Sequence, residues 1–184
     1  MTIQLPIRRV LILGCSGSGK STLARRLGEK LKLPVIILDQ RYWRAEWQQP
    51  TREEWHRQVG ELVRGEAWVI DGTYDDTLAI RLAAADTVIY LDFPRRVCVR
   101  RCLWRALTQW GRVRDTMASG CPERFDGGFL RYVWNFRRRT HPAVMAQLQP
   151  WPSQNRVYIL HSSAEVGHWL RQFDATLAAL EGQT

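Results

Sequence analysis

Apolar residues recur along this sequence in short continuous runs that alternate with longer amphipathic stretches. The continuous runs predict buried β-strands over 9–13, 35–38, 67–70, 87–91 and 156–160. The amphipathic stretches predict helices over 21–31, 51–64, 76–84, 95–110, 129–148 and 164–180. Strands that are apolar throughout are typical of a parallel sheet covered on both faces. The pattern therefore predicts an α/β protein, a three-layer α/β/α sandwich with a five-stranded parallel sheet.

No break in this alternation marks a domain boundary, and we expect residues 1–184 to form a single domain. The 45% content of hydrophobic residues is that of a globular protein. No apolar run reaches the length of about 18 residues that suggests a membrane-spanning helix. Residues 1–9 lack the apolar core and cleavage site of a secretory signal. We therefore expect a cytoplasmic protein without a membrane partner.

The positive charge of the chain is concentrated in one segment. Residues 95–139 carry twelve arginines, no lysine and three acidic residues, which gives this segment a net charge of +9. The net charge of the whole chain is also +9. The rest of the sequence is balanced between positive and negative residues. Arginine binds phosphate groups through a planar, two-pronged fork, whereas lysine acts as a point charge. The segment is therefore interpreted as one local device for contacting phosphate, in a nucleotide or in a nucleic acid.

The most specific motif directly follows the first predicted strand. The residues GCSGSGKS, 14–21, fit G-x-x-x-x-G-K-[ST] at every fixed position, and an amphipathic helix follows them. We call residues 14–21 the phosphate loop. Its backbone N–H groups would surround phosphate, Lys20 would reach the outer phosphates of ATP, and the Ser21 hydroxyl would bind Mg²⁺. The predicted nucleotide-binding residues are Gly14, Cys15, Ser16, Gly17, Ser18, Gly19, Lys20, Ser21 and Thr22.

Asp39, Asp71 and Asp92 each follow a predicted strand, at the edge of a parallel sheet where ligands bind, and two of them are candidate site residues. Asp71 follows the third strand and is the candidate second metal residue, beside Ser21. Asp39 follows the second strand and is the candidate base that orients an acceptor hydroxyl. Either carboxylate could instead cap a strand-to-helix turn, and that alternative stays open here.

The region after the second strand is rich in aromatic residues. Two interpretations are about equally supported: a binding surface for a flat base or ring that bears a negative group, or packing in the core. The residues concerned are Tyr42, Trp43, Trp47 and Trp55, together with Arg41 and Arg44.

Three further segments, VIDGTY (69–74), VIYLDFPRRVCVRR (88–101) and GRVRDTMASGCPERFDGGFLRYVWNF (111–136), carry a family resemblance. With the phosphate loop, they resemble the adenylate-kinase-like P-loop kinases, most closely the bacterial DNA topology modulation proteins. The resemblance implies a P-loop NTPase fold of the nucleoside-monophosphate-kinase type and Mg-ATP as phosphoryl donor. It also implies an acceptor-binding region at about 40–66 and a lid at about 111–128.

One departure from that family concerns the acceptor. Asp71 and Gly72 match the first two residues of the D-G-F-P-R motif of nucleotide kinases, but Thr73, Tyr74 and Asp75 replace Phe-Pro-Arg. In those kinases the arginine contacts the acceptor phosphate, so the departure puts AMP in doubt as the acceptor. Arg81 lies further along and cannot be assumed to replace it.

The arginines near the predicted lid receive a catalytic role in this interpretation. Arg105, Arg112 and Arg114 would stabilise the charge that develops on the transferred phosphoryl group, with Arg101, Arg131 and Arg138 nearby. Some of the twelve arginines are expected to lie on a solvated face, because they exceed what one triphosphate needs.

The sequence thus predicts a phosphotransferase that moves the γ-phosphoryl group of Mg-ATP to a small-molecule acceptor with an aromatic or nucleotide-like ring. A nucleic-acid-associated ATPase or DNA topology modulator that uses residues 95–139 is the alternative, less favoured because the excess charge falls in the predicted lid. A nucleotide-binding regulator without turnover is a third interpretation. The sequence names neither the acceptor nor the oligomeric state.

Overall fold

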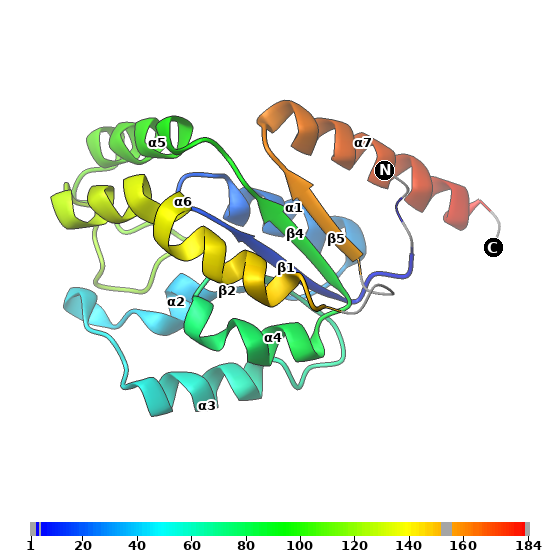
Figure 1. The fold of residues 1–184 in the computed structure, drawn as a ribbon, viewed down its shortest axis with the longest axis horizontal. Helices are drawn as coiled ribbons and strands as arrows, with labels where there is room; N and C mark the ends of the chain where they lie inside the picture. Colours follow the sequence, from blue (N-terminus) through cyan, green and yellow to red (C-terminus); the bar gives the residue numbers. More distant parts are fainter. Residues whose placement is uncertain (1–2, 4, 152–155, 183–184) are drawn as a thin grey trace.

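A computed structural model of the chain describes residues 3, 5–151 and 156–182. Its centre is a five-stranded sheet in the order β2-β3-β1-β4-β5, with every neighbouring pair parallel (Figure 1). The strands are β1 (Arg9–Gly14), β2 (Val35–Ile37), β3 (Trp68–Asp71), β4 (Thr87–Leu91) and β5 (Arg156–Leu160). All residues of β3 and β4 are buried, as the continuous apolar runs predict.

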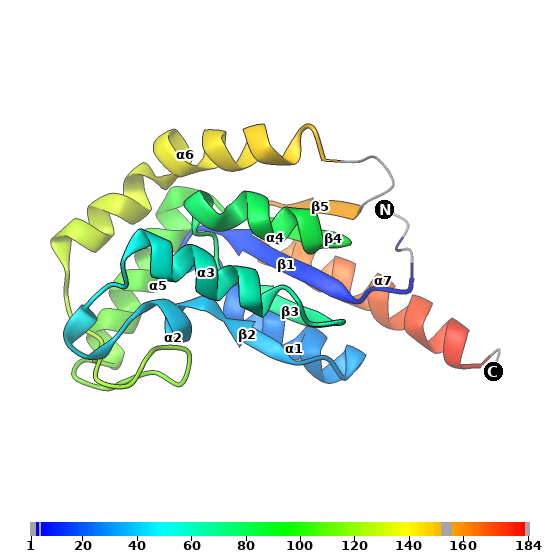
Figure 2. The ribbon, with the colours of Figure 1, turned by 90° about the horizontal axis from the view of Figure 1, so that it is seen from below.

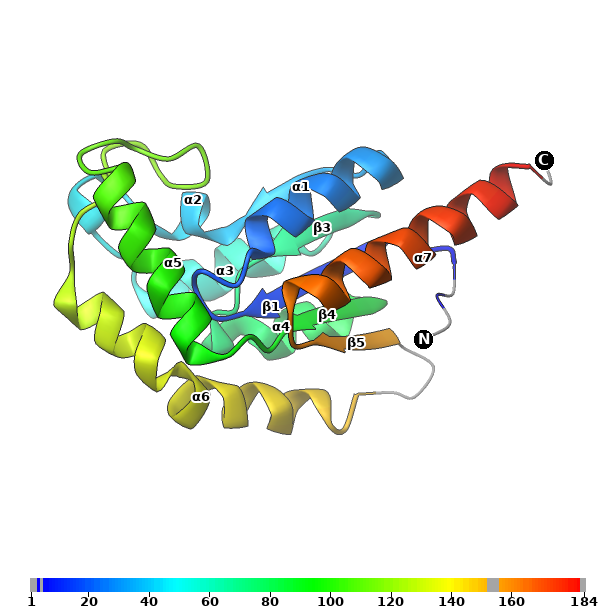
Figure 3. The ribbon, with the colours of Figure 1, turned by 90° about the horizontal axis from the view of Figure 1, so that it is seen from above.

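Helices cover both faces of the sheet, so the predicted three-layer sandwich is confirmed. The main helices are α1 (Lys20–Leu31), α3 (Arg52–Leu62), α4 (Leu78–Ala84), α5 (Arg95–Thr108), α6 (Gly127–Leu148) and α7 (Ser163–Glu181). Figure 3 shows α1 and α7 in front of one face, and Figure 2 shows α3 and α4 over the other.

Alternation of side chains along the strands divides the core between the two faces. Val10 and Ile12 of β1 pack in the cluster that contains residues of α1 and α7. Leu11 and Leu13 pack in the cluster that contains residues of α3 and α4. A strand buried on both sides in this way anchors the phosphate loop, which begins at its last residue.

Local sequence signals fix several element ends. The Thr51 side chain accepts from the Glu54 N–H (3.2 Å), and the Glu54 carboxylate accepts from the Thr51 N–H (3.0 Å), so the predicted capping box begins α3. The Asp126 side chain caps α6 by accepting from the Phe129 N–H. Helix α5 ends at Thr108, two residues before the predicted end.

Three short helical pieces were not predicted as separate elements. The second strand ends at Ile37 instead of residue 38, and α2 (Leu38–Tyr42) follows it, so Asp39 lies in the first turn of a helix. A 3₁₀ helix, η1 (Ala45–Trp47), comes next, and η2 (Asp75–Thr77) precedes α4. These pieces are shorter than the window over which hydrophobic periodicity can be recognised.

Within the described part of the chain, no helix is long and apolar enough to cross a membrane. The four cysteines are free thiols with buried side chains.

Candidate active site

A cleft of about 1390 Å³ opens at the carboxyl ends of the strands. This is the edge at which open parallel sheets bind ligands. The phosphate loop, α2, the segment after β3, the lid segment (residues 111–128) and the first turns of α7 all contribute to its walls. The cleft therefore unites parts of the chain that the sequence analysis treated separately.

Two glycines allow the phosphate loop to turn tightly against its surroundings. Gly17 has φ +81°, and a Cβ atom there would lie 2.6 Å from the Cys98 carbonyl oxygen. Gly19 has φ +100° at the start of α1. Because α1 begins at Lys20, its first N–H groups point back towards the loop, as an anion-binding helix terminus requires.

Side chains from three elements fix the loop by hydrogen bonds to its backbone. Lys20 Nζ donates to the Cys15 carbonyl (3.0 Å). Arg101 Nη1 donates to the carbonyls of Gly17 (3.2 Å) and Ser18 (3.3 Å). The Thr73 hydroxyl donates to the Gly14 carbonyl (2.8 Å) and accepts from the Gly14 N–H (3.0 Å). The loop is thus held by hydrogen bonds from α5 and from the segment after β3.

Ser21 and Asp71 meet at the base of the cleft. The Ser21 hydroxyl donates to Asp71 Oδ2 across 2.5 Å. Asp71 is buried, and its second oxygen, Oδ1, has no hydrogen-bond partner among the described residues. A buried carboxylate oxygen without a partner, beside a hydroxyl of the phosphate loop, fits a hydrated Mg²⁺ ion. The residues predicted to hold the metal are therefore suited to it.

Burial raises the pKa of Asp71 above its ordinary value, while Lys20 and the hydrogen bond from Ser21 lower it in part. The negative charge of Asp39 also raises the pKa of Asp71, which means that the two carboxylates act on each other within the same cleft. Burial disfavours the ionised form of the Asp71 carboxylate, and a bound cation would stabilise that form.

One part of the cleft wall consists of Asp39, Tyr42, Trp43 and Tyr74, which we call the acceptor wall. The Tyr74 hydroxyl donates to Asp39 Oδ1 (2.7 Å) and so fixes the orientation of that carboxylate. Burial, followed by the charge of Asp39, raises the pKa of Tyr74, which keeps its hydroxyl protonated. Tyr74 has φ +33°, an unusual backbone conformation for a residue other than glycine.

The aromatic residues of this region divide between the two interpretations. Trp55 is fully buried against Tyr42 and Tyr74 and belongs to the core. Trp43 and Trp47 line the cleft and contact each other edge to face. Tyr42 does both, since it packs on Trp55 and lines the cleft.

Glu123 joins two of the arginines to which the sequence gives a catalytic role. Its carboxylate binds Arg105 Nε of α5 (3.0 Å) and Arg114 Nε of the lid segment (2.7 Å), and all three side chains line the cleft. Arg112, by contrast, is exposed and does not line the cleft in this conformation. Arg131 and Arg138 of α6 are also exposed and outside the cleft.

The glycines and the missing periodicity of residues 111–128 predict a mobile loop, but the lid segment packs closely against the rest of the protein. Met117, Cys121 and Glu123 are buried within it. Its Gly120 carbonyl accepts from the N–H of Glu46 (3.1 Å), and the Cys121 thiol donates to the Arg44 carbonyl (3.0 Å). Figures 2 and 3 show this loop beside α2. The expectation rested on glycine content and missing periodicity, which say nothing about contacts with distant residues.

Arg81 does not replace the arginine that the sequence lacks after Gly72. It is fully buried, and its guanidinium donates to the carbonyls of Gly72 (2.7 Å), Thr73 and Tyr74 (2.6 Å). Its role is to hold the turn that places Asp71, Thr73 and Tyr74 around the cleft.

The chain has the P-loop kinase fold of the nucleoside-monophosphate-kinase type. Among solved structures, shikimate kinase from Acinetobacter baumannii in complex with shikimate superposes with a TM-score of 0.54 at 15% identity, covering 94% of this chain and 94% of that chain. Shikimate kinase from Aquifex aeolicus vf5 superposes with a TM-score of 0.52 at 16% identity, covering 91% of this chain and 97% of that chain. No protein-family model and no curated protein matches the sequence. The narrower resemblance to DNA topology modulation proteins stays a prediction.

The structural roles of four residues around the cleft were not predicted from the sequence: Thr73, Tyr74, Arg101 and Glu123. Thr73 and Tyr74 were noted only as departures from a motif. Glu123 carried a usable signal, because it is one of just three acidic residues among twelve arginines in 95–139. Such a residue is a candidate partner for several of them.

Proposed function

We propose that this protein is an ATP-dependent kinase that transfers the γ-phosphoryl group of Mg-ATP to a hydroxyl group of a small molecule. The observation that carries the proposal is that the phosphate loop, the Ser21–Asp71 pair and the acceptor wall share one cleft. A protein that only binds nucleotide has no need of a second wall with a positioned carboxylate. The fold shared with shikimate kinases supports a phosphotransferase without identifying the acceptor.

In this proposal the donor lies on the phosphate loop. The loop N–H groups and Lys20 bind the β- and γ-phosphates. The adenine lies towards α7, where Val166 and Leu170 line the cleft. Ser21 and Asp71 hold Mg²⁺, which when bound neutralises phosphate charge. Arg101 keeps the loop in shape through its two carbonyl contacts and reaches Ser163 at the start of α7 (2.8 Å).

Asp39 is the residue proposed to orient the acceptor hydroxyl and take its proton. The hydrogen bond from Tyr74 to Oδ1 fixes the direction of the Asp39 carboxylate, which lines the cleft. Trp43 and Trp47 line the cleft, and their rings are proposed to contact a flat or sugar-like acceptor. The acceptor-binding region at about 40–66 and the lid at about 111–128 thus form parts of one proposed catalytic domain, residues 1–184.

Arg105 and Arg114 are proposed to stabilise the transferred group. Glu123 holds both at the cleft with ion pairs that are largely shielded from water. Phosphate oxygens arriving beside them would compete with Glu123 for the same guanidinium donors. Preorganised cations of this kind are suited to the charge that develops during phosphoryl transfer. A catalytic role for Arg112 requires the lid segment to shift and stays a prediction.

The acceptor is proposed to lack a phosphate group. The motif arginine is absent, and Arg81 is buried away from the cleft. Three carboxylates, those of Asp39, Asp75 and Asp76, line the cleft. Their charge disfavours an anionic acceptor such as a nucleoside monophosphate.

The test is ADP release from Mg-ATP without an acceptor, with nucleosides, their monophosphates and small hydroxyl compounds, and with single- and double-stranded DNA. The Lys20→Ala variant serves as the blank. We expect stimulation by one class of small molecule. Stimulation by DNA alone would overturn the proposal in favour of a nucleic-acid-associated ATPase, and nucleotide binding with no turnover under any condition would favour a regulator.

A further inference from the structure

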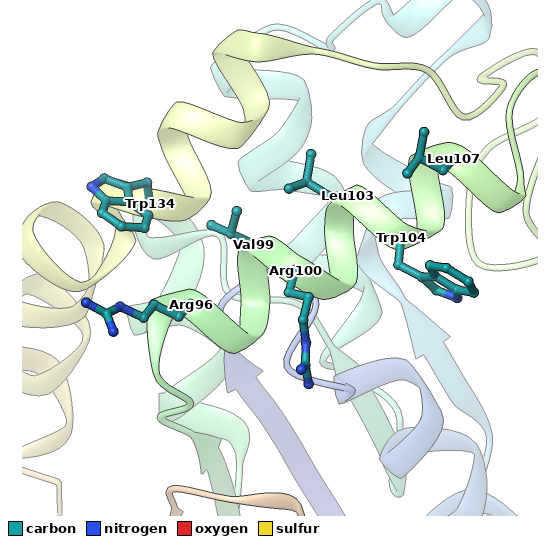
Figure 4. Close-up of a pocket in the computed structure, with 7 residues that line it drawn as sticks. All are labelled: Arg96, Val99, Arg100, Leu103, Trp104, Leu107 and Trp134. Carbon is teal, nitrogen blue, oxygen red and sulfur yellow. The ribbon is translucent and has the colours of Figure 1, made fainter.

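The outer surface of α5 is unusually apolar. Apart from Leu180, all the exposed large hydrophobic side chains of the described chain lie between residues 104 and 134. Trp104 is 68% exposed and Leu107 is 74% exposed, and both lie on α5. A shallow hollow of about 390 Å³ runs along this face, between α5 and Trp134 of α6 (Figure 4). Contiguous exposed apolar surface of this kind marks an interaction site.

The side chains of this α5 face form two rows, each spaced by four residues. One row is apolar and consists of Val99, Leu103 and Leu107. The other consists of Arg96, Arg100 and Trp104. Cys98 and Cys102 of the same helix are buried in the core, against which Val99 is partly packed. Leu103, Trp104 and Leu107 therefore give a second, outward apolar face to a helix that is already anchored.

We propose that this face binds a second copy of the chain, with the two α5 helices antiparallel across a twofold axis at Leu103. In that arrangement each residue faces the one equally far from Leu103 in the other direction. Leu103 meets its own copy, and Val99 meets Leu107 of the second chain. The apolar rows are therefore complementary to themselves.

The charged row also finds partners in this arrangement. Arg100 comes within two residues of the height of Trp104 in the second chain, about 3 Å along the helix axis, so its guanidinium can reach the indole ring. The two copies of Arg100 stand about 9 Å apart along the helix axis at a rise of 1.5 Å per residue, roughly one Debye length at physiological salt. Arg95 already lies over the Trp134 ring at 4.3 Å, which shows that this surface pairs arginine with tryptophan.

The extent of the face suits a small specific interface. Aromatic side chains bury about 150–250 Å² each when fully covered, and Trp104 and Trp134 are available in each copy. With Val99, Leu103 and Leu107, two copies would bury on the order of 1,000 Å², at the lower limit for a specific complex. We therefore expect a dimer with a dissociation constant in the micromolar range.

An acidic partner protein is the competing occupant, because the basic face carries no unpaired acidic side chain to repel one. The three acidic residues of 95–139 are all engaged elsewhere: Asp115 with Arg25, Glu123 with Arg105 and Arg114, and Asp126 with Arg124. Salt distinguishes the two occupants. A symmetric contact between basic faces persists or strengthens at high salt, whereas binding of an acidic partner weakens.

Sedimentation equilibrium of the full chain tests the proposal directly. We expect a concentration-dependent species of twice the chain mass of 21.4 kDa, which persists at high salt. Leu103→Glu should raise the dissociation constant about 30-fold or more, because it places two like charges at the axis. Leu180→Glu, which alters an exposed apolar residue on α7, is the matched control and should not change it.

A cross-link gives a second, independent readout. Since the native cysteines are buried, Leu103→Cys adds the one accessible thiol at the proposed axis. Mild oxidation should then yield a covalent dimer, and Arg171→Cys on exposed α7 should not. A wild-type protein that remains monomeric at every concentration, or a dimer that survives Leu103→Glu in a folded variant, would overturn the proposal.

Discussion

The Ser21 hydroxyl lies 2.5 Å from the Asp71 carboxylate, although the two residues belong to different strand-to-helix connections of the sheet. Parallel pairing of β1 with β3 brings them together, because Ile12 aligns with Asp71 and the phosphate loop begins two residues later. The metal-binding function that we propose for this pair is therefore a direct consequence of the sheet order.

Ser21→Ala is expected to separate nucleotide binding from its dependence on magnesium. The change removes the hydroxyl that faces Asp71 but leaves the loop backbone and Lys20 in place. ADP affinity measured by calorimetry should rise with Mg²⁺ in the wild type and change little with Mg²⁺ in the variant. A variant that keeps the full magnesium effect would show that Ser21 is not a metal residue.

Asp71→Asn should stabilise the metal-free protein while abolishing turnover. Burial raises the pKa of Asp71 in the folded chain above that in the unfolded chain, so the folded chain binds the proton more tightly. The stability that this proton contributes is present below the ordinary pKa of 3.8 and is lost as the pH rises through the folded-state pKa. The melting temperature in EDTA should therefore increase at neutral pH, by about 2–4 °C for each kcal/mol added to the free energy of unfolding. At the lowest pH it should hardly change.

The opposite result, a lower melting temperature for Asp71→Asn at neutral pH in EDTA, would mean that the ionised carboxylate stabilises the fold. In that case Lys20 and Ser21 would outweigh the cost of burying the charge. The direction of the shift decides between a functional and a structural carboxylate.

Arg81→Met should destabilise the protein strongly. The change leaves three backbone carbonyls, those of Gly72, Thr73 and Tyr74, without their buried donor. We expect a loss of about 3 kcal/mol or more in the free energy of unfolding, measured with urea. Arg171→Met, an exposed arginine on α7, should stay within about 0.5 kcal/mol of the wild type. Equal effects of the two changes would contradict the role assigned to Arg81.

Arg114→Ala is expected to lower kcat by on the order of 10²-fold with a much smaller effect on ADP affinity. Arg114 lines the cleft and pairs with Glu123, so its loss removes a cation placed for the transferred group. Arg112→Ala, measured in parallel, tests the remaining prediction from the sequence. A large effect of Arg112→Ala alone would mean that the lid segment rearranges when substrates bind.

A nucleoside should be a better acceptor than its 5′-monophosphate, by about tenfold or more in kcat/KM, a difference of about 1.4 kcal/mol. The reasons are the missing motif arginine and the carboxylates of Asp39, Asp75 and Asp76, which line the cleft. Comparing adenosine with AMP, and a sugar with its phosphate, isolates the effect of charge. Preference for the phosphorylated member of both pairs would contradict this prediction.

The sequence was sufficient for features encoded locally. Continuous apolar runs identified all five strands, and the phosphate loop was recognisable because its spacing, preceding strand and following helix are contiguous. Ser21 and Asp71 could be matched because both follow strands of a parallel sheet, whose carboxyl ends share an edge.

Features that depend on distant contacts were beyond the sequence analysis. Arg81 occupies a helix position where an arginine is normally solvated, and only the packing of the turn after β3 explains its burial. The lid segment has no periodicity, and its order comes from Glu46, Arg44 and Arg25 elsewhere in the chain. Helix α2 spans five residues, too few for a periodic pattern.

The most direct test of the account follows the γ-phosphoryl group itself. ATP labelled with ¹⁸O in the γ-phosphoryl group is incubated with the protein, Mg²⁺ and the acceptor that best stimulates ADP release, and the products are analysed by mass spectrometry. We predict that the label appears in a phosphorylated acceptor and that Lys20→Ala abolishes its appearance. Label found only in inorganic phosphate, whether or not DNA is present, would contradict phosphoryl transfer to a small molecule and identify the protein as an ATPase.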